Sequence, residues 1–173
     1  MAQISNLSSY PIIAPDQDDY FILTDAENNK ATKNCSIKNL QTFLGVDTTM
    51  VSVSVSAANL KVLGNAAYTL LVAPGVGYAY DVTNLTVFLD AGSQVFDFSS
   101  NTVIEQGSSN NFGVLSSAQL NSATDVAYKL NPPSILVLTE NTAISLNGGN
   151  ATTGDGTLYV NIIYRKVKLD STF

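Results

Sequence analysis

The side chains in this sequence that could carry out acid–base catalysis are mainly the carboxylates of Asp and Glu. Histidine is absent from the 173 residues, so the usual proton carrier near neutral pH and a common zinc or iron ligand are both missing. Carboxylate and lysine chemistry stay open by count, since eight Asp and Glu residues follow residue 49, enough for a glycosidase-type pair. These residues fall mostly at expected strand ends and turns, where Asp is common, and we interpret them as solvated turn residues.

Three further motifs have the composition of ligand sites but not the required context. Residues 16–19 (DQDD) offer oxygen atoms suited to calcium, but the glycine and the last glutamate of an EF-hand loop are missing. Gly75 and Gly77 precede an expected strand, whereas a phosphate-binding loop opens a helix. Cys35 is the single cysteine, and without a histidine to activate it we expect a packed structural thiol. The sequence therefore predicts a protein that is not an enzyme and has no cofactor and no metal site.

Charge and hydropathy exclude two classes of partner. The net charge is −6 and the isoelectric point about 4.3, which disfavours nucleic acid, because phosphates are bound by clustered Lys and Arg. Residues 1–10 lack the basic and apolar pattern of a signal peptide, and no apolar stretch is long enough to span a bilayer. We expect no membrane partner and synthesis in a cytoplasm.

The elements that would position any functional residue fall into two parts, residues 1–49 and 50–173. The first part is acidic and has only short apolar stretches. Residues 20–23 and 31–35 flank a turn-rich segment and predict a hairpin. Ser36 then caps a helix through Leu44, the only helix that we expect, and Gly45 ends it.

This N-terminal arm is too small to be stable alone, because a lone hairpin and a two-turn helix are both marginal in water. We therefore expect its apolar residues to bind a larger partner. The predicted contact residues are Ile12, Ile13, Tyr20, Phe21, Leu23, Ile37, Leu40, Phe43 and Leu44.

The second part has the pattern of an all-β domain. Val and Ser alternate over residues 51–56, as in a half-buried strand. Further strands are expected at residues 67–72, 79–89, 94–98, 134–138, 142–146 and 157–167, separated by Gly, Pro, Asn and Asp turns. Residues 100–113 are polar and predict a long surface loop, while residues 114–129 stay unassigned and could contain one helical turn or an irregular crossing. Mainly β structure with this spacing predicts a sandwich, a barrel or a jelly roll.

Aromatic residues occur along these expected strands at Tyr68, Tyr78, Tyr80, Phe88, Phe96 and Phe98. Such residues can form a stacking platform for sugars. Tryptophan, which carbohydrate platforms favour, is absent. We therefore predict that they fill the core or a subunit interface.

Several segments resemble known phage proteins. The arm is similar to the N-terminal segments of phage fibre and head-associated proteins, and the second part to β-rich domains of phage virions. The similar segments are ISNL (4–7), Pro11, DYFILTD (19–25), TK (32–33) and SIKNL (36–40) in the arm, and YTLLVAPGVG (68–77) and GDGTLYVNIIY (154–164) in the domain.

The resemblance implies a tailed-phage virion protein on the particle surface, made in the host cytoplasm. It implies a homotrimer anchored by its arm to a major capsid or tail protein subunit, with an antiparallel, jelly-roll-like β-sandwich that projects outward. Because the chain ends soon after the β domain, a capsid decoration or head-fibre protein is favoured. The alternative is a tail-fibre or tail-associated protein, in which loops at residues 74–77, 100–113 and 148–156 bind a host surface glycan.

Overall fold

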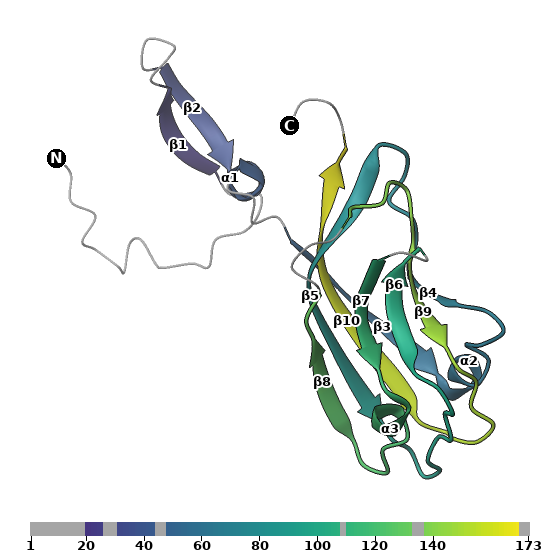
Figure 1. The fold of residues 1–173 in the computed structure, drawn as a ribbon. Helices are drawn as coiled ribbons and strands as arrows, with labels where there is room; N and C mark the ends of the chain where they lie inside the picture. Colours follow the sequence, from purple (N-terminus) through teal and green to yellow (C-terminus); the bar gives the residue numbers. More distant parts are fainter. Residues whose placement is uncertain (1–19, 26–30, 44–47, 108–109, 133–136, 170–173) are drawn as a thin grey trace, which may run out of the picture. The chain divides into compact units, whose positions relative to one another are not determined.

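The chain divides into two compact units, Met1–Asp47 and Thr48–Phe173. The computed structural model describes residues 20–25, 31–43, 48–107, 110–132 and 137–169 (Figure 1). Each of the three sheets lies within one unit.

The N-terminal unit contains the predicted hairpin and helix. Strands β1 (Tyr20–Asp25) and β2 (Ala31–Ser36) pair antiparallel, and α1 (Ile37–Phe43) follows β2 without a gap. The Ser36 hydroxyl accepts a hydrogen bond from the Asn39 amide at 3.1 Å, as expected for the N-cap of this helix. The sequence prediction for this unit is therefore confirmed at the level of its elements.

The described residues of the second unit form eight strands in two antiparallel sheets. They are β3 (Thr49–Ser56), β4 (Tyr68–Leu71), β5 (Tyr78–Asp90), β6 (Thr102–Gln106), β7 (Asn110–Leu115), β8 (Val126–Leu130), β9 (Ile144–Gly148) and β10 (Thr157–Lys168). One sheet has the order β3-β10-β5-β8 and the other β4-β9-β6-β7. The first strand of the unit pairs with the last, the second with the second-last, and so on inward. This nested pairing is that of a jelly roll and confirms the predicted class.

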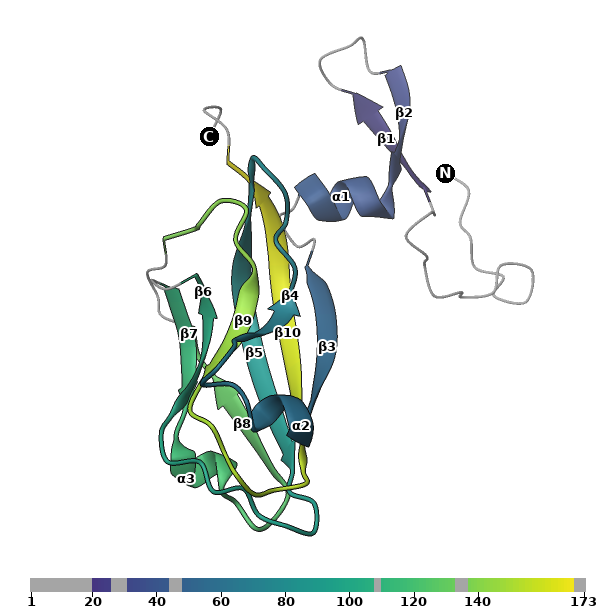
Figure 2. The same cartoon turned by 90° about the vertical axis from the view of Figure 1, so that its right-hand side faces the viewer.

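The core lies between the two sheets (Figure 2). Alternate residues of β5 and β10 point inward, and Leu85, Val87, Leu158 and Val160 are fully buried. The facing sheet contributes further buried residues, namely Ile104, Phe112, Leu115, Ile144 and Leu146. Because both central strands are long and regular, their apolar alternation was readable in the sequence.

The predicted loop over residues 100–113 was wrong, since β6 and β7 form a hairpin there. Its core-facing positions include Thr102, Gln106 and Asn110, which hide the apolar alternation of a strand. The Gln106 side-chain amide donates to the carbonyls of Thr139 and Thr142 at 3.3 and 3.2 Å. These bonds let polar residues occupy core positions.

The predicted strand at residues 94–98 was also wrong. Phe96 and Phe98 are buried, which explains the alternating pattern, but the segment is not paired in a sheet. The Asn121 side chain instead binds the backbone of Phe98, accepting from its amide at 2.8 Å and donating to its carbonyl at 3.0 Å. Of the strand predicted at 134–138, residues 134–136 lie outside the described residues, and Val137 and Leu138 are not in a strand.

Two single helical turns occur among the described residues of the second unit, one of them in the segment 114–129, for which the sequence leaves a helical turn open. They are α2 (Ala57–Leu60) and α3 (Ser117–Leu120), and each buries its last leucine in the core. Ser116 and Gln119 form a reciprocal capping box at the start of α3. Such short turns have no helical periodicity to detect. No helix in the described part of the chain has the length and apolar character needed to cross a membrane.

Candidate interaction surfaces

The predicted arm contacts fall on two of the three described elements of the N-terminal unit. Tyr20, Phe21 and Leu23 lie on β1, whereas Ile37, Leu40 and Phe43 lie on α1. The Tyr20 side chain is 69% exposed, and Ile37 and Leu40 are half-buried. The other predicted contacts, Ile12, Ile13 and Leu44, lie outside the described residues.

Cys35 lies at the junction between the hairpin and the helix. Its thiol is half-buried and donates to the Ser36 carbonyl at 3.5 Å. Ser36 therefore forms hydrogen bonds in both directions along the chain: its carbonyl accepts from the Cys35 thiol, and its hydroxyl caps α1. This junction fixes the start of the helix at the end of β2.

Two carboxylates join loops at the end of the domain where β5 ends and β10 begins. Asp97 accepts hydrogen bonds from the Thr152 hydroxyl, the Thr152 amide and the Thr153 amide at 2.5, 2.7 and 3.0 Å. The Thr152 hydroxyl and the backbone amide of Thr153 lower the pKa of Asp97 to about 2. A general acid in glycoside hydrolysis needs the opposite shift.

Asp155 has the same kind of environment on the neighbouring loop. It accepts from the Ser93 hydroxyl at 2.5 Å and from the Gln94 amide at 2.7 Å, and these bonds lower the pKa of the carboxyl. No three His, Cys, Asp or Glu side chains within the described ranges are grouped to hold a metal ion. The acidic residues 16–19 lie outside those ranges.

In the turn before β5, two glycine amides donate hydrogen bonds to side chains. The Gly75 amide donates to the Asn141 side-chain oxygen at 3.1 Å, and the Gly77 amide donates to the Glu140 carboxylate at 2.6 Å. Both glycines have positive φ, at 100° and 80°. This loop is a strand connection that is tied to residues 140 and 141.

The loops that the sequence assigned to glycan binding lie at opposite ends of the sandwich. Tyr78 pairs with Lys168 at one end of the β5–β10 ladder, and Asp90 pairs with Thr157 at the other. Residues 74–77 precede the first end, whereas residues 149–156 precede the second (Figure 1). The third segment, residues 100–113, is mostly the β6–β7 hairpin. The three segments therefore do not form one crown of loops.

The aromatic residues divide between core and surface. Phe96, Phe98 and Tyr80 are buried, and burial raises the pKa of Tyr80, helped by the neighbouring Tyr164. The Tyr80 hydroxyl donates to the Val72 carbonyl at 2.8 Å. Phe88 and Tyr159 instead lie side by side on the outside of the β3-β10-β5-β8 sheet, with ring centroids 6.1 Å apart.

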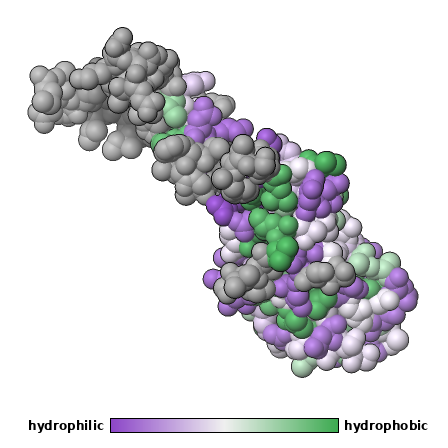
Figure 3. All heavy atoms as spheres, turned by 45° about the horizontal axis from the view of Figure 1, so that its top comes forward, coloured by the Kyte–Doolittle hydropathy of each residue, from purple (hydrophilic) through white to green (hydrophobic). Residues whose placement is uncertain are grey.

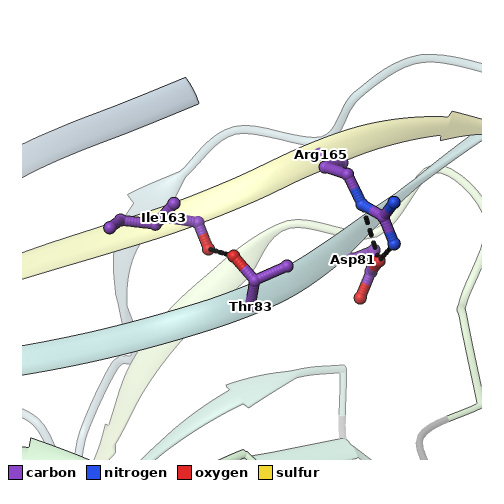
Figure 4. Close-up of polar contacts among 4 residues, drawn as sticks. All are labelled: Asp81, Thr83, Ile163 and Arg165. Carbon is purple, nitrogen blue, oxygen red and sulfur yellow. Dashed lines mark hydrogen bonds and ion pairs between the residues drawn. The ribbon is translucent and has the colours of Figure 1, made fainter. Parts of the chain in front are cut away.

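A β-bulge interrupts the long β5–β10 ladder. Ile163 pairs with Asn84 and Tyr164 with Val82, so Thr83 is the extra residue. The Thr83 hydroxyl donates to the Ile163 carbonyl at 3.2 Å (Figure 4). Beyond the bulge, the Arg165 guanidinium forms an ion pair with Asp81 on the adjacent strand (Figure 4).

We define the neutral face as three rows of outward-pointing residues on β3, β10 and β5, between this bulge and the row that contains Asp90. The rows follow the strand pairing, and the members are Met50, Ser52, Ser54, Tyr159, Asn161, Ile163, Asn84, Thr86 and Phe88. None of these nine residues is charged, whereas Asp90 at the end of β5 and Lys129 on β8 lie at the border of the face. Sequence analysis singled out Phe88 but not Tyr159 or Met50, because their proximity depends on pairing between distant segments.

The outside of the β4-β9-β6-β7 sheet, unlike the neutral face, carries a charged residue on an inner strand. Glu105 lies on its inner strand β6 and accepts a hydrogen bond from the Asn147 side chain of β9 at 3.0 Å. Val114 on β7 is 43% exposed. Figure 3 shows that hydrophobic residues on the visible surface are interspersed with hydrophilic ones.

Comparison with known proteins gives one match in structure. No family model matches the chain, and no curated protein matches its sequence. A chain of the cyanophage Pam1 capsid asymmetric unit is similar in structure, with a TM-score of 0.45 and 19% identity. The alignment covers 68% of this chain and 84% of that one.

Proposed function

We propose that this chain is a non-enzymatic structural protein of a tailed-phage virion. In this proposal the N-terminal unit anchors it to a major capsid or tail subunit, and the jelly roll projects from the particle surface. The chain acts as a homotrimeric capsid decoration or head-fibre protein. The resemblance of residues 4–40 to phage arms supports this assignment.

The observation that carries the proposal is the composition of the N-terminal unit. Its described part consists of a two-stranded hairpin and a seven-residue helix. Structures of this size bury too little apolar surface to be stable in water by themselves. Docking on a larger subunit supplies the missing burial, and Tyr20 at 69% exposure presents an aromatic side chain for it.

Trimer formation would strengthen such an anchor. One arm that buries a short helix and a few apolar residues binds weakly, but three linked arms bind as a set. After the first arm has docked, the other two are held near their sites at a high effective concentration. A trimer therefore supports stable attachment through individually weak contacts.

Particle binding tests the anchor directly. We expect Tyr20→Asp and Leu40→Asp to weaken binding to particles that lack the chain, prepared from the phage that encodes it, by at least about tenfold, since each buries a charge at the docking surface. The matched control is Asn39→Asp, which adds the same charge at an exposed position of α1. Co-sedimentation of the full chain with particles measures the affinities. Wild-type affinity in both variants would refute the anchoring role.

The tail-fibre alternative has a different signature. It predicts selective binding of the full chain to host glycans on an array, and it would locate the protein at the tail in immunogold images. Labelling over the shell without glycan binding would support the decoration or head-fibre role.

A further inference from the structure

The neutral face lies beside an edge strand that lacks the usual protection. Strand β3 is the edge of its sheet, and its register with β10 runs without a shift from Thr49 to Ser56. Its sequence, TMVSVSVS, contains neither a charged residue nor proline. Proteins commonly prevent uncontrolled strand pairing at sheet edges with charges, proline, bulges or short strands.

The other three edge strands of the domain have such features. Strand β8 is five residues long and carries Lys129, and β4 is four residues long with a register shift against β9. Strand β7 has a register shift against β6. Unprotected pairing capacity is therefore concentrated at β3, next to the neutral face.

Exposed apolar side chains occupy this same surface. Met50 on β3 is 65% exposed, and Phe88 and Tyr159 are 36% and 37% exposed. Tyr159 pairs directly with Phe88 on one side and with Ser54 on the other. Exposed Tyr, Phe and Met side chains are enriched at the centres of protein interfaces.

We propose that the neutral face and the β3 edge are the surface through which copies of this chain associate. Around a rotation axis, each residue near the axis faces its own copies, so a charged residue there is opposed by the same charge. In a chain of net charge −6, the three uncharged rows of the neutral face and the adjacent unprotected edge satisfy this requirement, and Asp90 and Lys129 lie only at the border of the face. This inference rests on the trimer in the proposed function and assigns the face that the copies share.

Charge substitution on the full chain tests the assignment. We expect Tyr159→Glu and Ser54→Glu each to lower the association constant at least about tenfold, because the introduced carboxylates oppose one another across the axis. The matched control is Val114→Glu, which places the same charge at an exposed valine on the outside of the other sheet. Native mass spectrometry and light scattering measure the mass, and circular dichroism measures folding. Ser54 is exposed, so its variant decides the question if Tyr159→Glu does not fold.

Mixing variants of opposite charge separates an interface effect from loss of folding. We expect Tyr159→Glu and Tyr159→Lys to form mixed oligomers when combined, although each alone is dissociated. Wild-type mass in both Tyr159→Glu and Ser54→Glu would overturn the assigned face and leave the oligomer itself intact. A monomeric wild-type chain at high concentration would overturn both this face and the proposed trimer, whereas the anchoring role is judged separately by particle binding.

Discussion

At the scale of single residues, surface carboxylates hold together loops that are distant in the sequence. Asp97 and Asp155 bind donors on a loop distant in sequence, so that residues 93–97 and 152–155 are held together. A third carboxylate, Asp125, accepts from the Ala91 amide at 3.0 Å. The end of the sandwich where β5 meets β10 therefore depends on ionised carboxylates for its loop structure.

Asp97→Asn tests this dependence. The pKa of Asp97 is about 2 in the folded protein, below the usual 3.8, so its ionised form stabilises the fold above about pH 4. This contribution is lost as the pH falls from 3.8 toward 2. We expect Asp97→Asn to melt a few degrees below wild type at pH 7, and the difference to shrink in thermal melts between pH 4 and 2. Asp90→Asn controls for the loss of one negative charge. A constant difference across this range would contradict the assignment.

At the scale of elements, the β6–β7 hairpin secures a segment that has no strand of its own. The Asn110 side-chain amide donates to the Val137 carbonyl and to the Thr139 hydroxyl, the latter at 2.7 Å. Together with Gln106, it binds the described residues from 137 to 142 to the end of the hairpin. Buried amides thus replace a ladder partner for this segment.

Asn110→Ala should destabilise the domain by about 1–3 kcal/mol, because it removes two hydrogen bonds of a buried side chain, each worth about 0.5–1.5 kcal/mol. Urea denaturation measures the free energy of unfolding, and limited proteolysis should show faster cleavage within residues 131–142. Asn131→Ala, at an exposed position, is the control. Equal stability of the two variants would show that the Asn110 bonds do not hold the segment.

These elements also show what the sequence could predict. Strands β3, β5 and β10 were predicted because their apolar residues alternate over long stretches. Strands β6 and β7 were missed because the polar residues Thr102, Gln106 and Asn110 occupy core positions. The hydrogen-bond partners of Gln106 and Asn110 are more than 25 residues away in the sequence. The Thr102 hydroxyl has no partner among the described residues. The neutral face was not predictable either, since Tyr159 meets Phe88 only through sheet pairing.

At the scale of the whole molecule, the domain contains its own core. Among the described residues, the buried apolar core runs from Val55 to Ile162, and both large sheets lie within Thr48–Phe173. The N-terminal unit adds a separate two-stranded sheet. We therefore expect folding of the jelly roll and the proposed anchoring by the arm to be separable.

Deleting residues 1–47 should leave a folded domain with the same melting temperature and the same number of subunits in its oligomer. Its core is complete, so the loss should be confined to particle binding. Calorimetry and light scattering on the shortened chain check the first two properties, and co-sedimentation checks the third. An unfolded product, or one that binds particles like the full chain, would contradict this division of roles.

The position of β10 has a consequence for synthesis on the ribosome. It is the last described strand in the chain, yet it lies between β3 and β5 in the middle of its sheet. During translation, β3 and β5 emerge from the ribosome before residues 157–168 have been made. The first sheet is therefore completed late, and chaperones that shield unpaired strands have their opportunity to act in that interval.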